Sequence, residues 1–212
     1  MRPGLRDSMI LLPRLYAIVD SSAHESTQDL LANADELAAA GCTLLQYRNK
    51  SGNARALLEQ ARELRTRLSK SMRLIMNDRA DLCLAADFDG VHVGQDDLSP
   101  KSVRGIIGPD RCLGVSTHNS EELRVADLTP ADYLAIGPIF ATSSKQNPDP
   151  VVGLEGVRRA RQLTRKPLVA IGGITRSNAA SVIEAGADSV AVISDLLREP
   201  RKSAEEFFRI LR

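Results

Sequence analysis

This sequence has no tryptophan, and aromatic residues make up only 3% of its 212 positions. Few ring faces are therefore available to stabilise a cationic ligand, and Tyr47 and Phe140 are the main candidates. Neither charge is in excess, because 28 lysines and arginines stand against 27 aspartates and glutamates. This balance excludes a general electrostatic attraction to nucleic acid or to an anionic membrane, so any anion-binding site must be local.

Long apolar runs are also missing, and none approaches the roughly 20 residues that a membrane-spanning helix needs. The apolar stretch near the start is too short for the core of a signal peptide, so we expect residues 1–13 to form a tail. Cys42, Cys83 and Cys112 are odd in number and far apart, which argues against a disulfide framework or a zinc site. We expect buried, reduced thiols in a cytoplasmic protein, with one catalytic domain over residues 14–212.

Eight short apolar runs are present, and each ends in a small cluster of polar residues and glycines. With their endings, the runs span residues 15–20, 44–50, 74–78, 91–97, 113–118, 134–138, 168–173 and 190–194. Runs of this length, bounded by turn residues and separated by helix-period stretches, indicate buried parallel strands in βα units. Eight such units predict an α/β fold with a single closed (β/α)8 TIM barrel, in which the polar endings converge on one face.

Amphipathic stretches between the runs predict the outer helices, among them residues 27–40, 54–69, 120–128, 156–164 and 178–185. Gly41 and Gly186 follow two of these stretches, at positions suited to left-handed helix C-caps. Residues 140–153 break the pattern, because they are polar, proline-rich and aperiodic. A long loop on the active face of a barrel is either a lid or ligand clamp, or a surface insertion without a function.

Three polar residues alternate at the end of the second run, namely Gln46, Arg48 and Lys50. Residues two apart in a strand project on the same side, so these three predict a common ligand. Guanidinium and ammonium groups pair with phosphates, which favours an anionic ligand. A solvated strand end would explain Lys50 but not Arg48, which lies close to an apolar segment.

Carboxylates follow the next two runs. Asp78 ends the third run, and Asp96 and Asp97 follow the fourth. Mg²⁺ commonly takes one or two protein carboxylates and completes its coordination with water and substrate phosphate oxygens. A single aspartate at such a position would be better explained as a helix cap, but two on adjacent strands predict a Mg²⁺ site.

Charge counting indicates the kind of anion. Mg²⁺ together with Arg48, Lys50 and Lys145 supplies roughly five positive charges, and two aspartates remove about two. The remainder matches pyrophosphate better than a monophosphate. Pyrophosphate as a leaving group is therefore the prediction.

A second anion site is predicted at residues 171–174, Ile-Gly-Gly-Ile, together with residues 192–194. Loops after the seventh and eighth strands bind phosphate through backbone amides in many barrels, and glycine permits close approach. A Gly-Gly pair without that position would equally indicate a tight turn. The hydroxyls of Thr142, Ser143 and Ser144 would lie between the two anion sites and orient a second substrate.

Two histidines accompany these clusters. His92, inside the fourth run, is predicted to be an interior hydrogen-bonding residue. His118 follows the fifth run beside Ser116, and it is either a proton carrier at the active face or a cap of the helix that begins near Asn119. No Ser-His-Asp or Cys-His arrangement is present, so covalent catalysis is not expected.

Five motifs together resemble one known family. They are Gln-Tyr-Arg-Asn-Lys at 46–50, Asn-Asp at 77–78, Gly-Val-His-Val-Gly-Gln-Asp-Asp at 90–97, Gly-Pro-Ile-Phe at 137–140 and Ala-Ile-Gly-Gly-Ile at 170–174. From residue 15 to residue 197 the chain resembles the thiamine-phosphate synthases. The resemblance implies a transferase of thiamine biosynthesis that joins a hydroxymethylpyrimidine pyrophosphate to a thiazole phosphate and releases pyrophosphate.

The resemblance also implies roles for individual residues. The pyrimidine pyrophosphate is expected to contact Gln46, Tyr47, Arg48, Asn49, Lys50, Asn77, Ser116 and Lys145, of which Arg48, Lys50, Ser116 and Lys145 are expected to be catalytic. The thiazole phosphate is expected to contact Thr142, Ser143, Ser144, Gly173, Ile193 and Ser194. Mg²⁺ is expected on Asp78 and Asp97. Ala141 and Ser144 depart from the family pattern, which has proline and threonine there.

The family is associated with a dissociative reaction, in which pyrophosphate leaves before the thiazole nitrogen attacks. Protein groups then act through electrostatics and positioning. Two alternatives stay open: a thiazole tautomerase of the same superfamily, for which a histidine near position 118 is implied as the proton carrier, and a non-catalytic barrel that binds a phosphate ligand. The expected partners are small molecules, and the sequence leaves open whether the chain forms a homo-oligomer.

Overall fold

Eight parallel strands close into a barrel in which each strand pairs with the next and β8 pairs with β1. The computed structural model describes residues 11–68, 72–142 and 149–212. The strands are β1 (Leu15–Asp20), β2 (Leu44–Arg48), β3 (Arg73–Asn77), β4 (Gly90–Val93), β5 (Cys112–Thr117), β6 (Tyr133–Ile136), β7 (Leu168–Ile171) and β8 (Ser189–Val192). All eight predicted strands are present, and the (β/α)8 prediction is confirmed.

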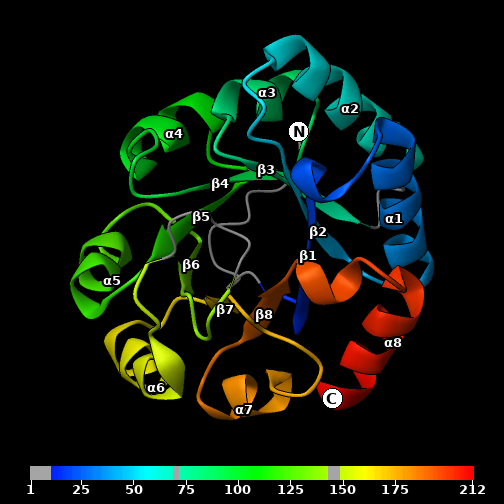
Figure 1. The fold of residues 1–212 in the computed structure, drawn as a ribbon. Coiled ribbons are helices and arrows are strands. Elements are labelled where there is room, and N and C mark those ends of the chain that lie inside the picture. Colours follow the sequence, from blue (N-terminus) through cyan, green and yellow to red (C-terminus); the bar gives the residue numbers. More distant parts are fainter. Residues whose placement is uncertain (1–10, 69–71, 143–148) are drawn as a thin grey trace.

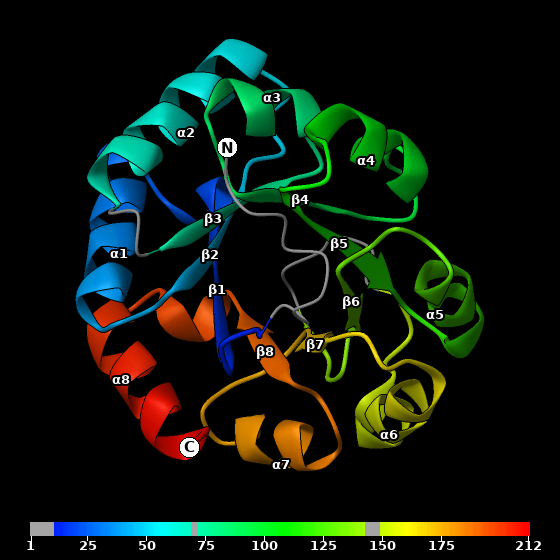
Figure 2. The same cartoon turned by 180° about the vertical axis from the view of Figure 1, so that it is seen from behind.

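Helices surround the barrel and cover the outer face of every strand, as Figure 1 and the opposite view in Figure 2 show. In the described ranges they are α1 (Thr27–Ala39), α2 (Ala54–Arg67), α3 (Ala80–Ala85), α4 (Pro100–Ile107), α5 (Ser120–Asp127), α6 (Gly153–Leu163), α7 (Ala179–Glu184) and α8 (Pro200–Ile210). Two short 3-10 helices, η1 (Ser21–Ala23) and η2 (Ser194–Leu196), follow β1 and β8. The last helix, α8, packs beside the first, α1, which closes the ring of helices around the barrel.

The helix ends follow local chemistry. Ser26 caps α1 by accepting a hydrogen bond from the amide of Asp29 at 3.1 Å, and Asn53 caps α2 in the same way. Gly41 and Gly186 have positive φ angles of 97° and 114°, which confirms the predicted left-handed turns after α1 and α7.

Alternation along the strands separates two apolar cores. Outward-facing residues pack under the helices, whereas Tyr16, Ile18, Ile75 and Tyr133 belong to a smaller core inside the barrel. Leu12, from the segment predicted to be a tail, is buried in this inner core. Residues 1–10 of that segment lie outside the described residues.

The three cysteines are buried and free, as expected. Burial raises the pKa of each thiol to about 12, so all three stay protonated at neutral pH. Within the described ranges, no helix combines the length and the apolar character needed to cross a bilayer.

Candidate active site

The carboxyl ends of the strands surround one cavity, as the barrel fold predicts. Eight of the residues predicted to bind substrate line it: Gln46, Arg48, Asn77, Ser116, Thr142, Gly173, Ile193 and Ser194. They come from β2, β3, β5 and the segments after β6, β7 and β8, so residues far apart in the sequence do converge.

Charged side chains gather beside the ends of β1 to β4. We call Asp20, Arg48, Lys50, Asp78 and Asp97 the charged wall, and Arg48 is the member that lines the cavity. The guanidinium of Arg48 is paired with Asp20, whose Cα lies opposite that of Arg48 in the β1–β2 register. The ammonium of Lys50 is paired with Asp78. Both cations of the wall are thus already matched by a carboxylate of the same wall.

Asp78 and Asp97 lie side by side at the edge of the charged wall. Burial raises the pKa of Asp78, and the neighbouring Asp97 carboxylate raises it further against the lowering effect of Lys50. Asp97 is held by the amide of Gly94, which donates to its Oδ2 at 2.8 Å. Two adjacent carboxylates repel each other unless a proton or a cation lies between them, and hard oxygen ligands suit Mg²⁺. The residues present therefore fit the predicted metal.

A chain of buried polar groups crosses the inside of the barrel below the charged wall. Gln46 Nε2 donates to the hydroxyl of Tyr16 at 2.9 Å, and the hydroxyls of Tyr16 and Tyr133 are 3.0 Å apart. His92 Nδ1 lies 2.9 Å from the Tyr133 hydroxyl, and its Nε2 lies 2.8 Å from the Ser116 hydroxyl. His92 is an interior hydrogen-bonding residue, as predicted.

Burial raises the pKa of both tyrosines, so their hydroxyls stay protonated at neutral pH. The chain therefore links the amide of Gln46, the two tyrosine hydroxyls and the imidazole of His92, and it fixes the orientation of Gln46 at one end and Ser116 at the other. Both end residues line the cavity.

Asn77 has a polar atom without a partner. Its Nδ2 is buried and makes no hydrogen bond within the described residues, although the residue lines the cavity. A buried donor left unpaired costs free energy. A ligand oxygen in the cavity would satisfy it.

The opposite side of the cavity is built from backbone. We call Gly172, Gly173, Ile193 and Ser194 the amide wall. Gly172 and Gly173 have positive φ angles of 100° and 63°, and a Cβ on Gly173 would lie 2.5 Å from the carbonyl oxygen of Ala141. Only glycine fits this turn without strain. In the described part of the chain, the amide of Gly173 donates no hydrogen bond, so it is available to an anion in the cavity.

His118 also lines the cavity, at the end of β5. Its Nδ1 lies 3.0 Å from Glu122 of α5, and its Nε2 lies 3.2 Å from Asp149 in the segment before α6. The side chain that caps α5 is that of Asn119, which accepts from the amides of Glu121 and Glu122. The imidazole of His118 instead connects two segments at the rim, and its role in proton transfer stays a prediction.

Two side chains predicted to contact the first substrate lie elsewhere. The hydroxyl of Tyr47 donates to Gln60 of α2 at 2.6 Å, and Asn49 Nδ2 donates to both of these groups. Tyr47 packs edge to face against Phe88 in the outer core, because odd-numbered residues of β2 face the helices. Neither side chain lines the cavity, and neither does that of Lys50. The ring of Tyr47 is therefore not in a position to stabilise a cation in the cavity.

The predicted residues Ser143, Ser144 and Lys145 lie outside the described residues. Three residues that the sequence did not single out as ligand contacts belong to the site: Asp20, Tyr16 and Tyr133. Asp20 had a signal, because it is a carboxylate at a strand end like Asp78. The two tyrosines had none, since their partners are more than 25 residues away.

Comparison with known proteins tests the motif-based resemblance. The family model described as thiamine monophosphate synthase matches residues 15–196. The chain belongs to this family. A thiamine-phosphate synthase of Koribacter versatilis is 61% identical over 207 residues, covering 96% of this chain and 98% of that protein. The one of Chloroflexus aurantiacus is 44% identical over 182 residues, covering 85% and 83%.

The fold agrees with the same family. The solved structure of a thiamine phosphate pyrophosphorylase from Pyrococcus furiosus superposes with a TM-score of 0.81 at 33% identity, covering 93% of this chain and 95% of that one. The predicted resemblance is thus confirmed over nearly the whole barrel, and with it the assignment to a transferase of thiamine biosynthesis.

Proposed function

We propose that the cavity joins a hydroxymethylpyrimidine pyrophosphate to a thiazole phosphate by a dissociative, Mg²⁺-assisted reaction. The proposal depends on one observation: Arg48 of the charged wall and the four residues of the amide wall line the same cavity. A reacting pyrophosphate and a non-reacting phosphate need different surroundings, and the two walls offer them.

The pyrophosphate group would lie on the charged wall. Arg48 would donate charged hydrogen bonds to it, Lys50 would turn from Asp78 toward it, and Asn77 would donate its unpaired Nδ2–H to the same substrate. Asp78 and Asp97 would hold Mg²⁺, which neutralises the charge that develops on the departing oxygen.

The chemical step then needs no protein nucleophile. The bond between the exocyclic carbon and oxygen breaks with its electron pair leaving on pyrophosphate, and the amino group of the pyrimidine delocalises the cation. The lone pair of the thiazole nitrogen closes the new carbon–nitrogen bond. Gln46 and Ser116, oriented by the buried polar chain, would hold the pyrimidine in line for this attack.

The thiazole phosphate would lie on the amide wall, where Gly173, Ile193 and Ser194 line the cavity. Thr142 lines the cavity between the walls and would contact the same substrate. We retain Ser143, Ser144 and Lys145 as proposed contacts on the strength of the family resemblance. A cytoplasmic location stays a prediction, supported by the three buried thiols.

The direct test incubates the pure protein with both substrates, with Mg²⁺ and with a chelator. We expect thiamine phosphate and pyrophosphate in equal amounts, and only when Mg²⁺ is present. Isomerisation of a thiazole phosphate without condensation would instead show a tautomerase. Binding of both molecules without turnover would show a ligand-binding barrel.

A further inference from the structure

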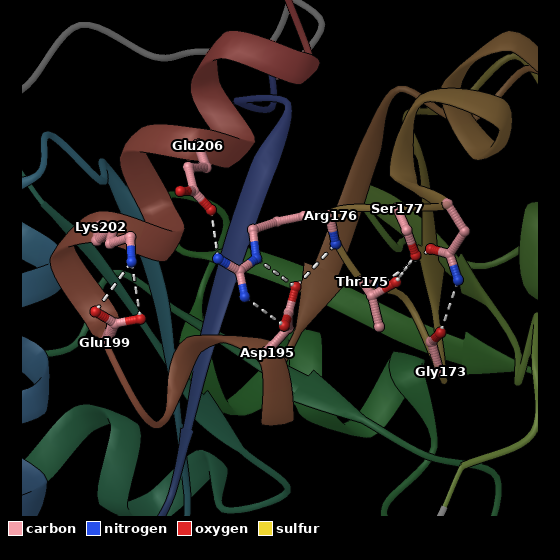
Figure 3. A network of polar contacts seen from close by, with 9 residues as sticks. Gly173, Thr175, Arg176, Ser177, Asp195, Glu199, Lys202 and Glu206 are labelled. Atoms are coloured by element: carbon pink, nitrogen blue, oxygen red, sulfur yellow. Dashed lines mark hydrogen bonds and ion pairs between the residues drawn. The ribbon is translucent and has the colours of Figure 1, made fainter.

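One arginine joins the two halves of the amide wall without lining the cavity. Arg176 lies in the turn between β7 and α7, three residues after Gly173. Its backbone amide and its Nε donate to Oδ2 of Asp195 at 2.8 and 3.0 Å, and its Nη2 donates to Oδ1 at 3.2 Å. Asp195 directly follows Ser194 in η2. Figure 3 shows the Arg176 side chain extending from the β7 loop, with its guanidinium between Asp195 and Glu206.

A second carboxylate completes the arrangement. Nη1 of Arg176 is paired with Glu206 of α8, so one side chain connects three segments that follow β7 and β8 (Figure 3). Asp195 and then Glu206 raise the pKa of Arg176, so its charge is permanent. Two carboxylates already neutralise this cation, and it makes no part of the cavity lining. Its effect on a ligand must therefore be through geometry.

The β7 loop is also cross-linked within itself. Asn178 Nδ2 donates to the carbonyl of Gly173 at 3.0 Å, and Asn178 Oδ1 accepts from the amide of Thr175 at 2.8 Å. The hydroxyls of Thr175 and Ser177 are 2.8 Å apart. A loop held in this way moves as one unit, so fixing Arg176 also fixes the peptide of Gly173.

The amides of Gly173 and Ser194 lie on separate loops, so they can bind one phosphate together only if the distance between them is fixed before the ligand binds. A displacement of about 1 Å is enough to lose much of such an interaction. Within the described residues, Arg176 makes the side-chain contacts between the β7 loop and η2.

We propose that Arg176 is a positioning residue that holds the amide wall in the shape needed for a phosphate monoester. The inference rests on the proposed function, because it assumes that the thiazole phosphate occupies this wall. It assigns Arg176, Asp195 and Glu206 to the specificity of that subsite, although none of the three touches the ligand.

The test compares Arg176→Gln and Arg176→Lys with Lys202→Gln. Lys202 is a matched control, because it forms an exposed ion pair with Glu199 at 3.1 Å on the same helix as Glu206 (Figure 3). For Arg176→Gln we expect KM for the thiazole phosphate to rise about 10- to 100-fold, with KM for the pyrimidine pyrophosphate changed less than about twofold. Arg176→Lys should give partial rescue, and Lys202→Gln should match the wild type.

A second measurement does not need turnover. Inorganic phosphate should raise the melting temperature of the wild type and of Lys202→Gln, and it should do so only at higher concentration in Arg176→Gln. If Arg176→Gln does not fold, Asp195→Asn removes the same charge pairing with an isosteric side chain and should give the same selective loss.

Three results would overturn the inference: an unchanged KM for the thiazole phosphate, equal rises in both KM values, or equal stabilisation of the wild type and Arg176→Gln by phosphate. A wild type that is inactive with both substrates would count against the proposed function instead, and the phosphate measurement would still test Arg176.

Discussion

The two walls of the cavity offer different groups to an anion. On the charged wall, side chains from β1 to β4 supply full charges, and each cation is paired with a carboxylate of the same wall. On the amide wall, the lining residues after β7 and β8 are uncharged, and the guanidinium of Arg176 is paired with Asp195 and Glu206 outside the cavity lining.

This difference matches what happens to each phosphate. Charge develops on a leaving pyrophosphate in the transition state, so ionic groups and a metal there accelerate the chemical step. The phosphate of the other substrate keeps its charge throughout, so a fixed set of amides is sufficient to bind it. Changes in the charged wall should therefore lower kcat or weaken the pyrimidine substrate, and changes in the amide wall should raise KM for the thiazole phosphate.

The largest effect is expected from Asp78→Asn. It removes one of the two proposed Mg²⁺ carboxylates, and we expect kcat to fall by at least about 100-fold, the order seen when one group that stabilises developing charge is lost. The fold should survive, because Asp78 has a φ of 62° and asparagine tolerates that conformation well. Steady-state kinetics at saturating substrates measure the loss.

Asp96→Asn is the matched control, since Asp96 is exposed and adjacent to Asp97 in the sequence. It should keep wild-type activity. Full activity in Asp78→Asn would remove the metal assignment from the charged wall.

Arg48→Ala should come next. Losing a charged hydrogen bond should weaken binding of the pyrimidine substrate by about 1.5–3 kcal/mol and leave the thiazole phosphate unaffected. Calorimetric titration with each ligand separately would measure both. Because the variant leaves the buried Asp20 without its partner, the double variant Asp20→Asn/Arg48→Ala controls for that unpaired charge. Equal weakening of both ligands would contradict the division into two walls.

A smaller effect is expected from Gly173→Ala on the other wall. The added Cβ would contact the carbonyl of Ala141 and force alanine into a left-handed conformation, which costs about 1–2 kcal/mol. KM for the thiazole phosphate should rise about tenfold at unchanged kcat. Gly108→Ala is the control, because Gly108 has a similar φ of 74° and open space around its Cβ position. A lower kcat in Gly173→Ala, with an unchanged kcat in Gly108→Ala, would contradict a role for Gly173 in thiazole phosphate binding alone.

The smallest effect is expected from Tyr133→Phe, which interrupts the buried chain between Tyr16 and His92. The free energy of unfolding should fall by about 1–3 kcal/mol. The value of kcat/KM should fall a few-fold, because the hydrogen bonds that orient Ser116 are weakened. Tyr47→Phe removes a hydroxyl from the outer core instead, so it should reduce stability without changing the kinetics. Denaturant unfolding and steady-state kinetics of both variants would show whether the buried chain of polar groups contributes to kcat/KM.

Local sequence was sufficient for the fold and for much of the cavity lining. Each strand is a continuous apolar run, so its position could be predicted without tertiary information. The same period of two that placed Gln46 and Arg48 inside also places Tyr47 outside. The family motif includes Tyr47 between these two residues, but the alternation along β2 turns its side chain toward the helices.

Other features depend on residues that only the closed barrel brings together. Asp20 meets Arg48 through the pairing of β1 with β2, 28 residues apart. The two carboxylates paired with Arg176 lie 19 and 30 residues away in the sequence. The buried polar chain from Gln46 to Ser116 depends on tyrosines from β1 and β6. Such contacts leave no periodic pattern in the sequence.

A crystal structure with Mg²⁺, pyrophosphate and the thiazole phosphate would test the two-wall division most directly. We predict pyrophosphate and the metal at Arg48, Asp78 and Asp97, and the monophosphate at the amides of Gly173 and Ser194. Both anions on the same wall, or a metal bound away from Asp78 and Asp97, would contradict it.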